Sequence, residues 1–222
     1  MKLVESMNLR PGVTAVIGGG GKTTFLRTAG EELAESHRVL LCTTTKILPF
    51  PGLPTGSTLE ELQELSRTQS LVCGGVPIPE TGKLGPLEIP MADLAACFDY
   101  VLVEADGAAG RPLKAHAPHE PVIPQEADQV IAILGASAFG NPIEEVAHRP
   151  ELYAAMVGAA LTAPVTPEMA AWVLRTEQLH TSVFVNQVEE VERLAWTGRL
   201  AGGLDCPVVA GSLREGVYFP CK

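Results

Sequence analysis

Short apolar, β-branched runs alternate with helical segments along most of the chain, and this pattern constrains the fold more than any other feature. Most runs are continuously apolar, which is typical of strands buried on both faces of a parallel sheet. The pattern therefore predicts an α/β fold in three layers (α/β/α) with a mostly parallel sheet. The expected strands are Val13–Gly18, Arg38–Thr45, Ser70–Gly75, Tyr100–Asp106, Gln129–Gly135, Ser182–Gln187 and Pro207–Ser212.

Helical patterns fill the segments between these runs. In one of them, Ser57 is followed three residues later by Glu60, which fits a capping box. In another, Pro150 falls in the first helical turn, where proline is favoured. The expected helices are Lys22–His37, Ser57–Arg67, Met91–Phe98, Pro150–Leu161, Pro167–Arg175 and Glu189–Ala201.

Two segments break the alternation. Residues 75–90 are rich in proline and glycine and are consistent with a small hairpin. Residues 107–126 show little periodicity, and loops of that length inside a compact domain are often functional. No repeat or linker divides the chain. We therefore expect one domain over residues 1–222, P-loop nucleoside-triphosphatase-like in class, with these two excursions.

The charge balance excludes several kinds of partner. The chain carries 16 Lys and Arg against 26 Asp and Glu, a net charge of −10. Nucleic-acid backbones and anionic membranes repel such a protein. No apolar signal core or membrane span is visible, and the five cysteines form no Cys-x-x-Cys pair. We expect a cytoplasmic protein with no nucleic-acid or membrane partner, whose phosphate ligands are held by a local arrangement.

The stretch "AVIGGGGKTTF" places four glycines between an expected strand and an expected helix. The full P-loop pattern needs a glycine where Val16 stands, so this loop is two residues shorter. Backbone N–H groups at the helix start would face an anion, Lys22 would reach the terminal phosphates, and the Thr23 hydroxyl could bind Mg²⁺. A plain glycine-rich turn is the alternative. The residues expected to bind ATP or GTP here are Gly18, Gly19, Gly20, Gly21, Lys22, Thr23 and Thr24.

Two carboxylates follow in "DYVLVEADG", Glu104 and Asp106. Their two-residue spacing projects them to the same side at the carboxyl end of a strand, where ligands of such sheets bind. We assign Asp106 to the metal or its water and Glu104 as second ligand or general base, with Lys22 the third catalytic residue. Asn186 follows a buried strand at the position of a base-reading motif. Gln187 and Glu189 depart from Asn-Lys-x-Asp, so guanine is not specified, but Asn186 could still contact a base and is a candidate nucleotide-binding residue.

Several polar residues near these motifs are candidate contacts for an acidic substrate. "CTTTKI" ends a strand with threonines and a lysine, of which Thr45 and Lys46 could meet the same crevice. In the long loop, Arg111 and Lys114 are the cations closest to the acidic pair. The alternative for Thr45 and Lys46 is an ordinary β-branched strand end, and for Arg111 and Lys114 it is a surface position. "HAPHE" contains two histidines, but their spacing resembles no common zinc site.

The motifs "GGGGKTT", "TTTK", "VEADGAAGRPLKAHAPHEPVIP" and "HRPE", in that order, resemble the YqeC-type selenium cofactor biosynthesis proteins. The resemblance implies a P-loop nucleoside-triphosphatase fold with this shortened loop. It also implies a role in maturing a molybdenum hydroxylase that carries labile selenium. The residues that fall in the family's motifs are Lys22, Thr23, Glu104, Asp106, Arg111 and Lys114. The loop also resembles that of Mur-type ligases, but the later segments do not.

Three functions remain open on the sequence. The first is Mg²⁺-dependent binding and hydrolysis of ATP or GTP, coupled to selenium insertion or cofactor delivery. The second is a chaperone that holds a nucleotide-bearing or pterin cofactor for the hydroxylase without turnover. The third is a kinase or ligase that acts on a small acid gripped by Lys46, Arg111 and Lys114. P-loop relatives often dimerise across the nucleotide face, so a homodimer is also open.

Overall fold

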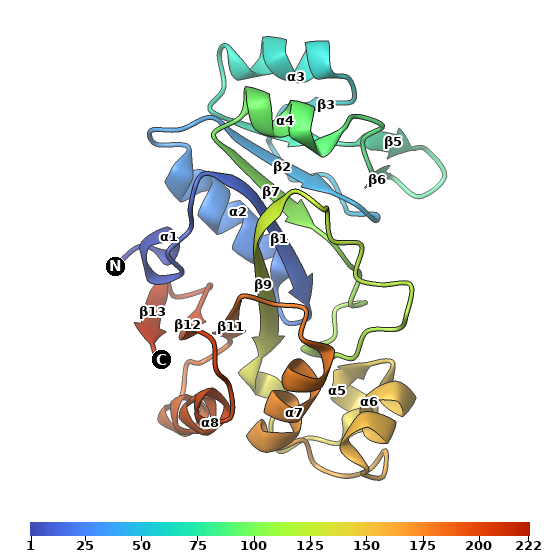
Figure 1. The fold of residues 1–222 in the computed structure, drawn as a ribbon, viewed down its shortest axis with the longest axis vertical. Coiled ribbons are helices and arrows are strands. Elements are labelled where there is room, and N and C mark those ends of the chain that lie inside the picture. The colour runs from blue at the N-terminus through green and yellow to red at the C-terminus, as the bar shows by residue number, and fades with distance from the viewer.

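The computed structural model describes residues 1–222, and a nine-stranded sheet runs through it (Figure 1). The strand order is β13-β12-β11-β9-β1-β7-β2-β4-β3. Every neighbouring pair is parallel except β12 and β13. The strands are β1 (Gly12–Gly18), β2 (Val39–Thr43), β3 (Thr55–Gly56), β4 (Leu71–Gly74), β7 (Tyr100–Glu104), β9 (Ala127–Gly135), β11 (Ser182–Asn186), β12 (Val208–Ser212) and β13 (Val217–Pro220).

All the expected strands are present, and the mostly parallel α/β sheet is confirmed. β7 ends at Glu104 rather than at the expected Asp106. Asp106 therefore lies outside the strand, and the alternation of side chains along a strand does not place it on the same side as Glu104. β13 was not expected: it is a short antiparallel edge strand, three of whose four residues are not buried. Smaller pairs are the β5–β6 hairpin (Val76–Ile78, Lys83–Gly85) and β8–β10 (Leu113–Lys114, Ala147–His148).

The helices follow the expected segments, most of them with shorter bounds, but α7 runs to Glu177, two residues beyond the expected Arg175, and the short helices α1 and α5 were not expected. α3 begins one residue later than the capping box placed it: Thr58 is the N-cap and pairs with Glu61, while Ser57 donates to the same Glu61 carboxylate. α6 ends at Gly158, which adopts a left-handed conformation. The helices are α1 (Leu3–Ser6), α2 (Lys22–Leu33), α3 (Leu59–Ser66), α4 (Met91–Cys97), α5 (Ile143–Val146), α6 (Pro150–Val157), α7 (Pro167–Glu177) and α8 (Val191–Gly202), with a 3-10 turn at Ala136–Ala138.

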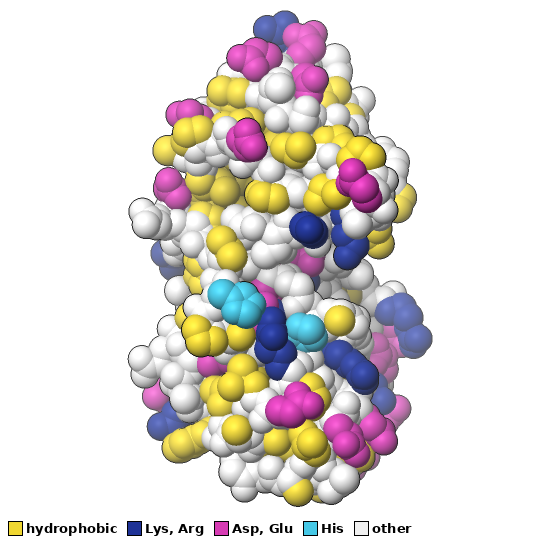
Figure 2. All heavy atoms as spheres, turned by 90° about the vertical axis from the view of Figure 1, so that its right-hand side faces the viewer, with side chains coloured by type: hydrophobic (Ala, Val, Ile, Leu, Met, Phe, Trp, Pro, Cys, Tyr) yellow, Lys and Arg dark blue, Asp and Glu magenta, His cyan; other side chains and the backbone are white.

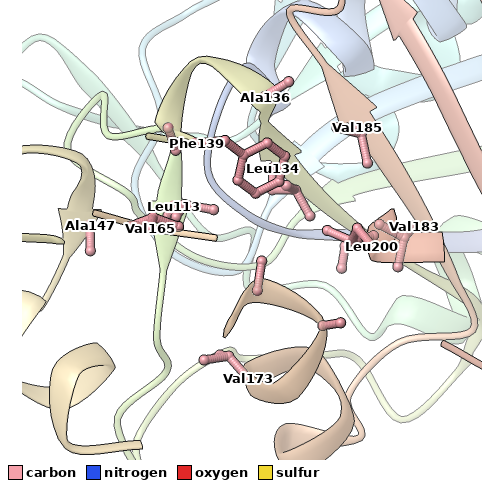
Figure 3. Packing of buried hydrophobic residues seen from close by; sticks show 14 of the residues in the cluster. Leu113, Leu134, Ala136, Phe139, Ala147, Val165, Val173, Val183, Val185 and Leu200 are labelled. Atoms are coloured by element: carbon pink, nitrogen blue, oxygen red, sulfur yellow. The ribbon is translucent and has the colours of Figure 1, made fainter. Parts of the chain in front are cut away.

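Helices cover both faces of the sheet, as the three-layer prediction requires. One face carries α1 and α2, whose Phe25 and Leu26 are fully buried in a cluster with Phe184 of β11. On the other face, α3 and α4 cover the half near β2 and β4. The helices α7 and α8 cover the half near β9 and β11, where Leu134 and Val185 face Val173 and Leu200 (Figure 3).

The centre of the sheet holds the glycine loop (Gly18–Gly21). β1 lies between β9 and β7, and the loop leads from its carboxyl end directly into α2. The loops after β7, β2, β9 and β11 leave from the same edge because these strands are parallel. Residues from five strand ends therefore meet around one helix N-terminus. No helix in the chain has both the length and the apolar character needed to cross a bilayer.

Candidate functional site

The glycine loop is shaped by backbone conformations that other residues rarely adopt. Gly20 and Gly21 have φ angles of +81° and +123°. A Cβ at Gly20 would lie 2.4 Å from the Gly135 nitrogen, and one at Gly21 would lie 2.6 Å from Asn186 Nδ2. Both positions need glycine because of their φ angles and because neighbouring strands approach the loop closely. The glycines are thus required to bring the loop against β9 and β11.

The loop leaves a run of backbone donors free. The N–H groups of Gly18, Gly19 and Gly20 bond within the chain, to Asp106, Ile133 and Arg111 respectively. The next four N–H groups, from Gly21 to Thr24, have no partner in the chain, and the first α2 bond is from Phe25 to Gly21. They lie at the positive end of a helix dipole, so together they form an anion-binding arrangement.

Two pockets lie on either side of this helix start. The first, here the Lys22 pocket, has a volume of about 630 Å³. Its wall includes residues 20–24, Glu104, residues 107–111 and the cations Lys46 and Lys83. The second, the Asn186 pocket, measures about 510 Å³ and is lined by Asn186, Gln187, Glu189 and Arg193 among others. Both pockets share Gly20, Gly21, Thr24 and Gln187, so they meet at the loop.

The carboxylates at the end of β7 occupy different environments. Glu104 reaches the Lys22 pocket, where its Oε2 accepts a hydrogen bond of 3.0 Å from the Thr23 hydroxyl. Burial raises the pKa of Glu104, and the Lys22 charge and the Thr23 hydrogen bond offset part of that rise. Thr23 and Glu104 therefore place a hydroxyl and a carboxylate together at the pocket wall.

Asp106 is fully buried, away from both pockets. Its Oδ1 lies 3.0 Å from Lys22 Nζ, and its Oδ2 lies 3.2 Å from Lys114 Nζ and 2.7 Å from His116 Nε2. Burial alone would raise the pKa of Asp106. The hydrogen bond from His116 and the charges of Lys22 and Lys114 outweigh it and hold the pKa well below its usual range.

The contacts of Asp106 extend away from the loop, and we call these residues the Asp106 cluster: Lys22, Asp106, Lys114, His116, Glu120 and Glu177. His116 Nδ1 lies 2.8 Å from Glu177 Oε2 at the end of α7. Burial opposes protonation of His116, but its hydrogen bonds to Asp106 and Glu177 raise its pKa. Lys114 Nζ also lies 2.8 Å from Glu120. The pKa of Glu120 is lowered to about 2 because hydrogen bonds from Arg149 and Lys114, together with the Lys114 charge, outweigh its partial burial. The cluster joins the glycine loop to α7.

Asn186, at the end of β11, links the glycine loop to the segment that follows the neighbouring strand β12. Its Nδ2 donates to the Gly20 carbonyl (2.7 Å), and its Oδ1 accepts from the Leu213 N–H (3.0 Å). Glu189 accepts a hydrogen bond of 2.7 Å from the Ser212 hydroxyl and forms an ion pair of 3.3 Å with Arg193. Gln187 receives a hydrogen bond from Ser137. Asn186 thus fixes the loop, while Gln187 lines both pockets.

The structure brings some of the expected site residues together and separates others. Gly20, Gly21, Lys22, Thr23, Thr24, Lys46, Glu104 and Arg111 line the Lys22 pocket. Gly18 and Gly19, at the start of the loop, are buried and do not line the pocket, and Thr45 hydrogen-bonds Thr43 instead of lining it. Lys114, expected to contact an anion from a loop, lies in strand β8 with its side chain fully buried in the Asp106 cluster.

Three residues of the site escaped sequence reasoning. His116 lies in "HAPHE", whose histidine spacing fits no common zinc site, and nothing local in the sequence indicates its pairing with Asp106 and Glu177. Glu177 lies 61 residues from His116, and nothing local to it suggests their contact. Lys83 lies in the expected hairpin, whose position over the pocket has no sequence signal.

The chain is similar to known proteins over a segment that includes the glycine loop and the Lys22 pocket apart from Gln187. The family model described as "YqeC protein" matches residues 14–151. The Escherichia coli (strain K12) protein "Uncharacterized protein YqeC" is 35% identical over 158 residues, which span 67% of this chain and 62% of that protein. Chloroplast FtsY of Physcomitrella patens has a TM-score of 0.48 and 17% identity, covering 91% of this chain and 59% of FtsY. The chain belongs to the YqeC family.

Proposed function

We propose that this protein binds a nucleoside triphosphate, ATP or GTP, across the glycine loop and hydrolyses it with Mg²⁺. The observation that carries the proposal is the set of four unpartnered N–H groups from Gly21 to Thr24. In a chain with a net charge of −10, they make a local anion site beside Lys22. The Asn186 pocket lies next to the same loop and has room for a nucleoside.

Mg²⁺ fits the oxygen donors at the wall of the Lys22 pocket. This ion prefers hard oxygen ligands and usually takes only one or two carboxylates, with phosphates and water completing its shell. The Thr23 hydroxyl and the Glu104 carboxylate are 3.0 Å apart and supply such donors. A bound Mg²⁺ would offset negative charge on the transferring phosphoryl group.

The chain's own residues would do the remaining work. The free N–H groups of the loop would hold the phosphates, and Lys22 would turn from Asp106 towards the terminal phosphate. Glu104 has two alternative roles: it would hold Mg²⁺ together with Thr23, or it would accept the proton of the attacking water. Asp106 would act indirectly, by positioning Lys22 and the Gly18 N–H.

The biological role we propose is accessory to the maturation of a selenium-dependent molybdenum hydroxylase. It rests on the resemblance of the motifs, and the partner would be the hydroxylase or its pterin cofactor. Dimerisation across the nucleotide face and a cytoplasmic location stay predictions.

Phosphate release from ATP and GTP tests the proposal, with and without Mg²⁺, for wild type and Glu104→Gln. We expect Mg²⁺-dependent release by wild type and a loss of about 100-fold in the variant, a typical contribution of a general base. Glutamine can still accept the Thr23 hydrogen bond, so the fold is kept. Tight nucleotide binding with no release by wild type would favour the non-hydrolysing carrier instead.

A further inference from the structure

The Lys22 pocket carries more positive charge than its glycine loop explains. Four cations, Lys22, Lys46, Lys83 and Arg111, line it against the single carboxylate of Glu104. Lys22 is already paired with Asp106, and Arg111 donates to the Glu145 carbonyl. The ammonium groups of Lys46 and Lys83 have neither an ion pair nor a hydrogen bond in the chain. Unpaired lysines in so acidic a protein point to an external anion.

A specific backbone arrangement aims these two lysines at the pocket. Ile47 and Leu84 form an antiparallel bridge, with N–H to carbonyl bonds of 3.0 and 2.8 Å. Both side chains are 3% exposed, so their neighbours project to the opposite face. Lys46 and Lys83 are those neighbours, and both line the pocket. The β5–β6 hairpin thereby holds Lys83 on the wall that Lys46 forms.

The order of strands separates this wall from the nucleoside side. Asn186 follows β11, which lies beyond β9 on one side of β1. Lys46 follows β2, which lies beyond β7 on the other side of β1, roughly 10 Å away at the usual strand spacing. A nucleotide with its base beside Asn186 would direct its terminal phosphate towards the lysines. Figure 2 faces this side of the molecule, and dark-blue cationic side chains gather around its middle.

We propose that Lys46 and Lys83, with Arg111 beside them, form a subsite for a second substrate: a small polyanion bearing carboxylate or phosphate groups. The subsite extends the proposed function and rests on it, because the bound nucleotide determines which part of the Lys22 pocket stays free for a second substrate. Lys114 takes no part, since its side chain is fully buried between Asp106 and Glu120. The second substrate would meet the terminal phosphate at the Glu104 end of the pocket, where one of its oxygens would take the place of the attacking water, bond to the terminal phosphorus and release the nucleoside diphosphate.

Titration calorimetry on the full chain tests the subsite. Wild type is saturated with a non-hydrolysable ATP or GTP analogue and Mg²⁺, then titrated with tricarballylate or with 2,3-bisphosphoglycerate. The two probes separate carboxylate from phosphate recognition. We expect at least one to bind wild type, and its affinity to fall tenfold or more in the double variant Lys46→Gln, Lys83→Gln. The analogue's affinity should fall less than the probe's, because the loop N–H groups hold its phosphates, and Arg67→Gln, an exposed cation outside the pocket, should bind the probe as wild type does.

Two results would overturn the subsite: no probe binds the loaded wild type, or a probe binds the double variant equally well. If the analogue itself does not bind wild type, the proposed function fails separately. The same titrations without analogue then decide the subsite alone. Binding that the double variant loses would support it, and binding that is absent or retained would contradict it.

Discussion

Two carboxylates two residues apart, Glu104 and Asp106, end in opposite environments. Glu104 lies on an open pocket wall beside an exposed threonine, and burial raises its pKa. Asp106 is sealed among Lys22, Lys114 and His116, which hold its pKa low. The pocket side is therefore suited to bind and react with a ligand. The sealed side is suited to hold the loop and its lysine in place.

The largest expected difference between Asp106 and Glu104 is in how much each contributes to the free energy of unfolding. Asp106→Asn leaves Lys22 and Lys114 buried without their carboxylate, so we expect a loss of about 3–5 kcal/mol in the free energy of unfolding. Glu104→Gln keeps the hydrogen bond from Thr23, and its effect should be below about 1 kcal/mol. Urea unfolding of both variants measures this. Equal losses would show that the two carboxylates do not differ in role.

The next effect concerns His116 and pH. Its pKa is raised in the folded state, so its stabilisation is fully present below its ordinary pKa of about 6.5 and is lost as pH rises through the folded value. His116→Asn should cost about 2 kcal/mol near pH 6. The difference in the free energy of unfolding between wild type and His116→Asn should narrow as pH rises. Unfolding of both proteins at several pH values measures this difference. A gap independent of pH would mean that His116 is neutral in its pair with Asp106.

The smallest expected effect is that of replacing Thr23, which lies on the Lys22 pocket. Thr23→Val removes one hydrogen bond to Glu104 at an otherwise exposed position of the helix start, so the free energy of unfolding should fall by only about 1 kcal/mol. The dependence of nucleotide affinity on Mg²⁺ should fall about tenfold, equivalent to ~1.4 kcal/mol. Calorimetric titration of nucleotide with and without Mg²⁺ measures it, with Thr24→Val as the matched control. An unchanged Mg²⁺ effect in Thr23→Val would remove Thr23 from the proposed metal site.

The features that could be predicted are those that depend on residues close together in the sequence. Continuous apolar runs placed β1, β2, β4, β7, β9, β11 and β12, and the glycines placed the strand–loop–helix junction. Edge strand β13 was missed because it is short and largely unburied, and such a strand shows no apolar pattern in the sequence. The Asp106 cluster was missed because its contacts, such as His116 with Glu177, join distant segments. Lys114 looked like a loop residue because a two-residue strand has no periodicity.

The most direct measurement is thermal unfolding of wild type and Lys22→Met with ATP and GTP, each with and without Mg²⁺. A ligand at ~100 times its dissociation constant adds roughly 2.7 kcal/mol, which for a chain of this size raises the midpoint by roughly 5–10 °C. We predict that shift in wild type for at least one nucleotide, and its loss in Lys22→Met relative to that variant's own midpoint. No shift in wild type at millimolar nucleotide, or the same shift in the variant, would contradict nucleotide binding by the glycine loop.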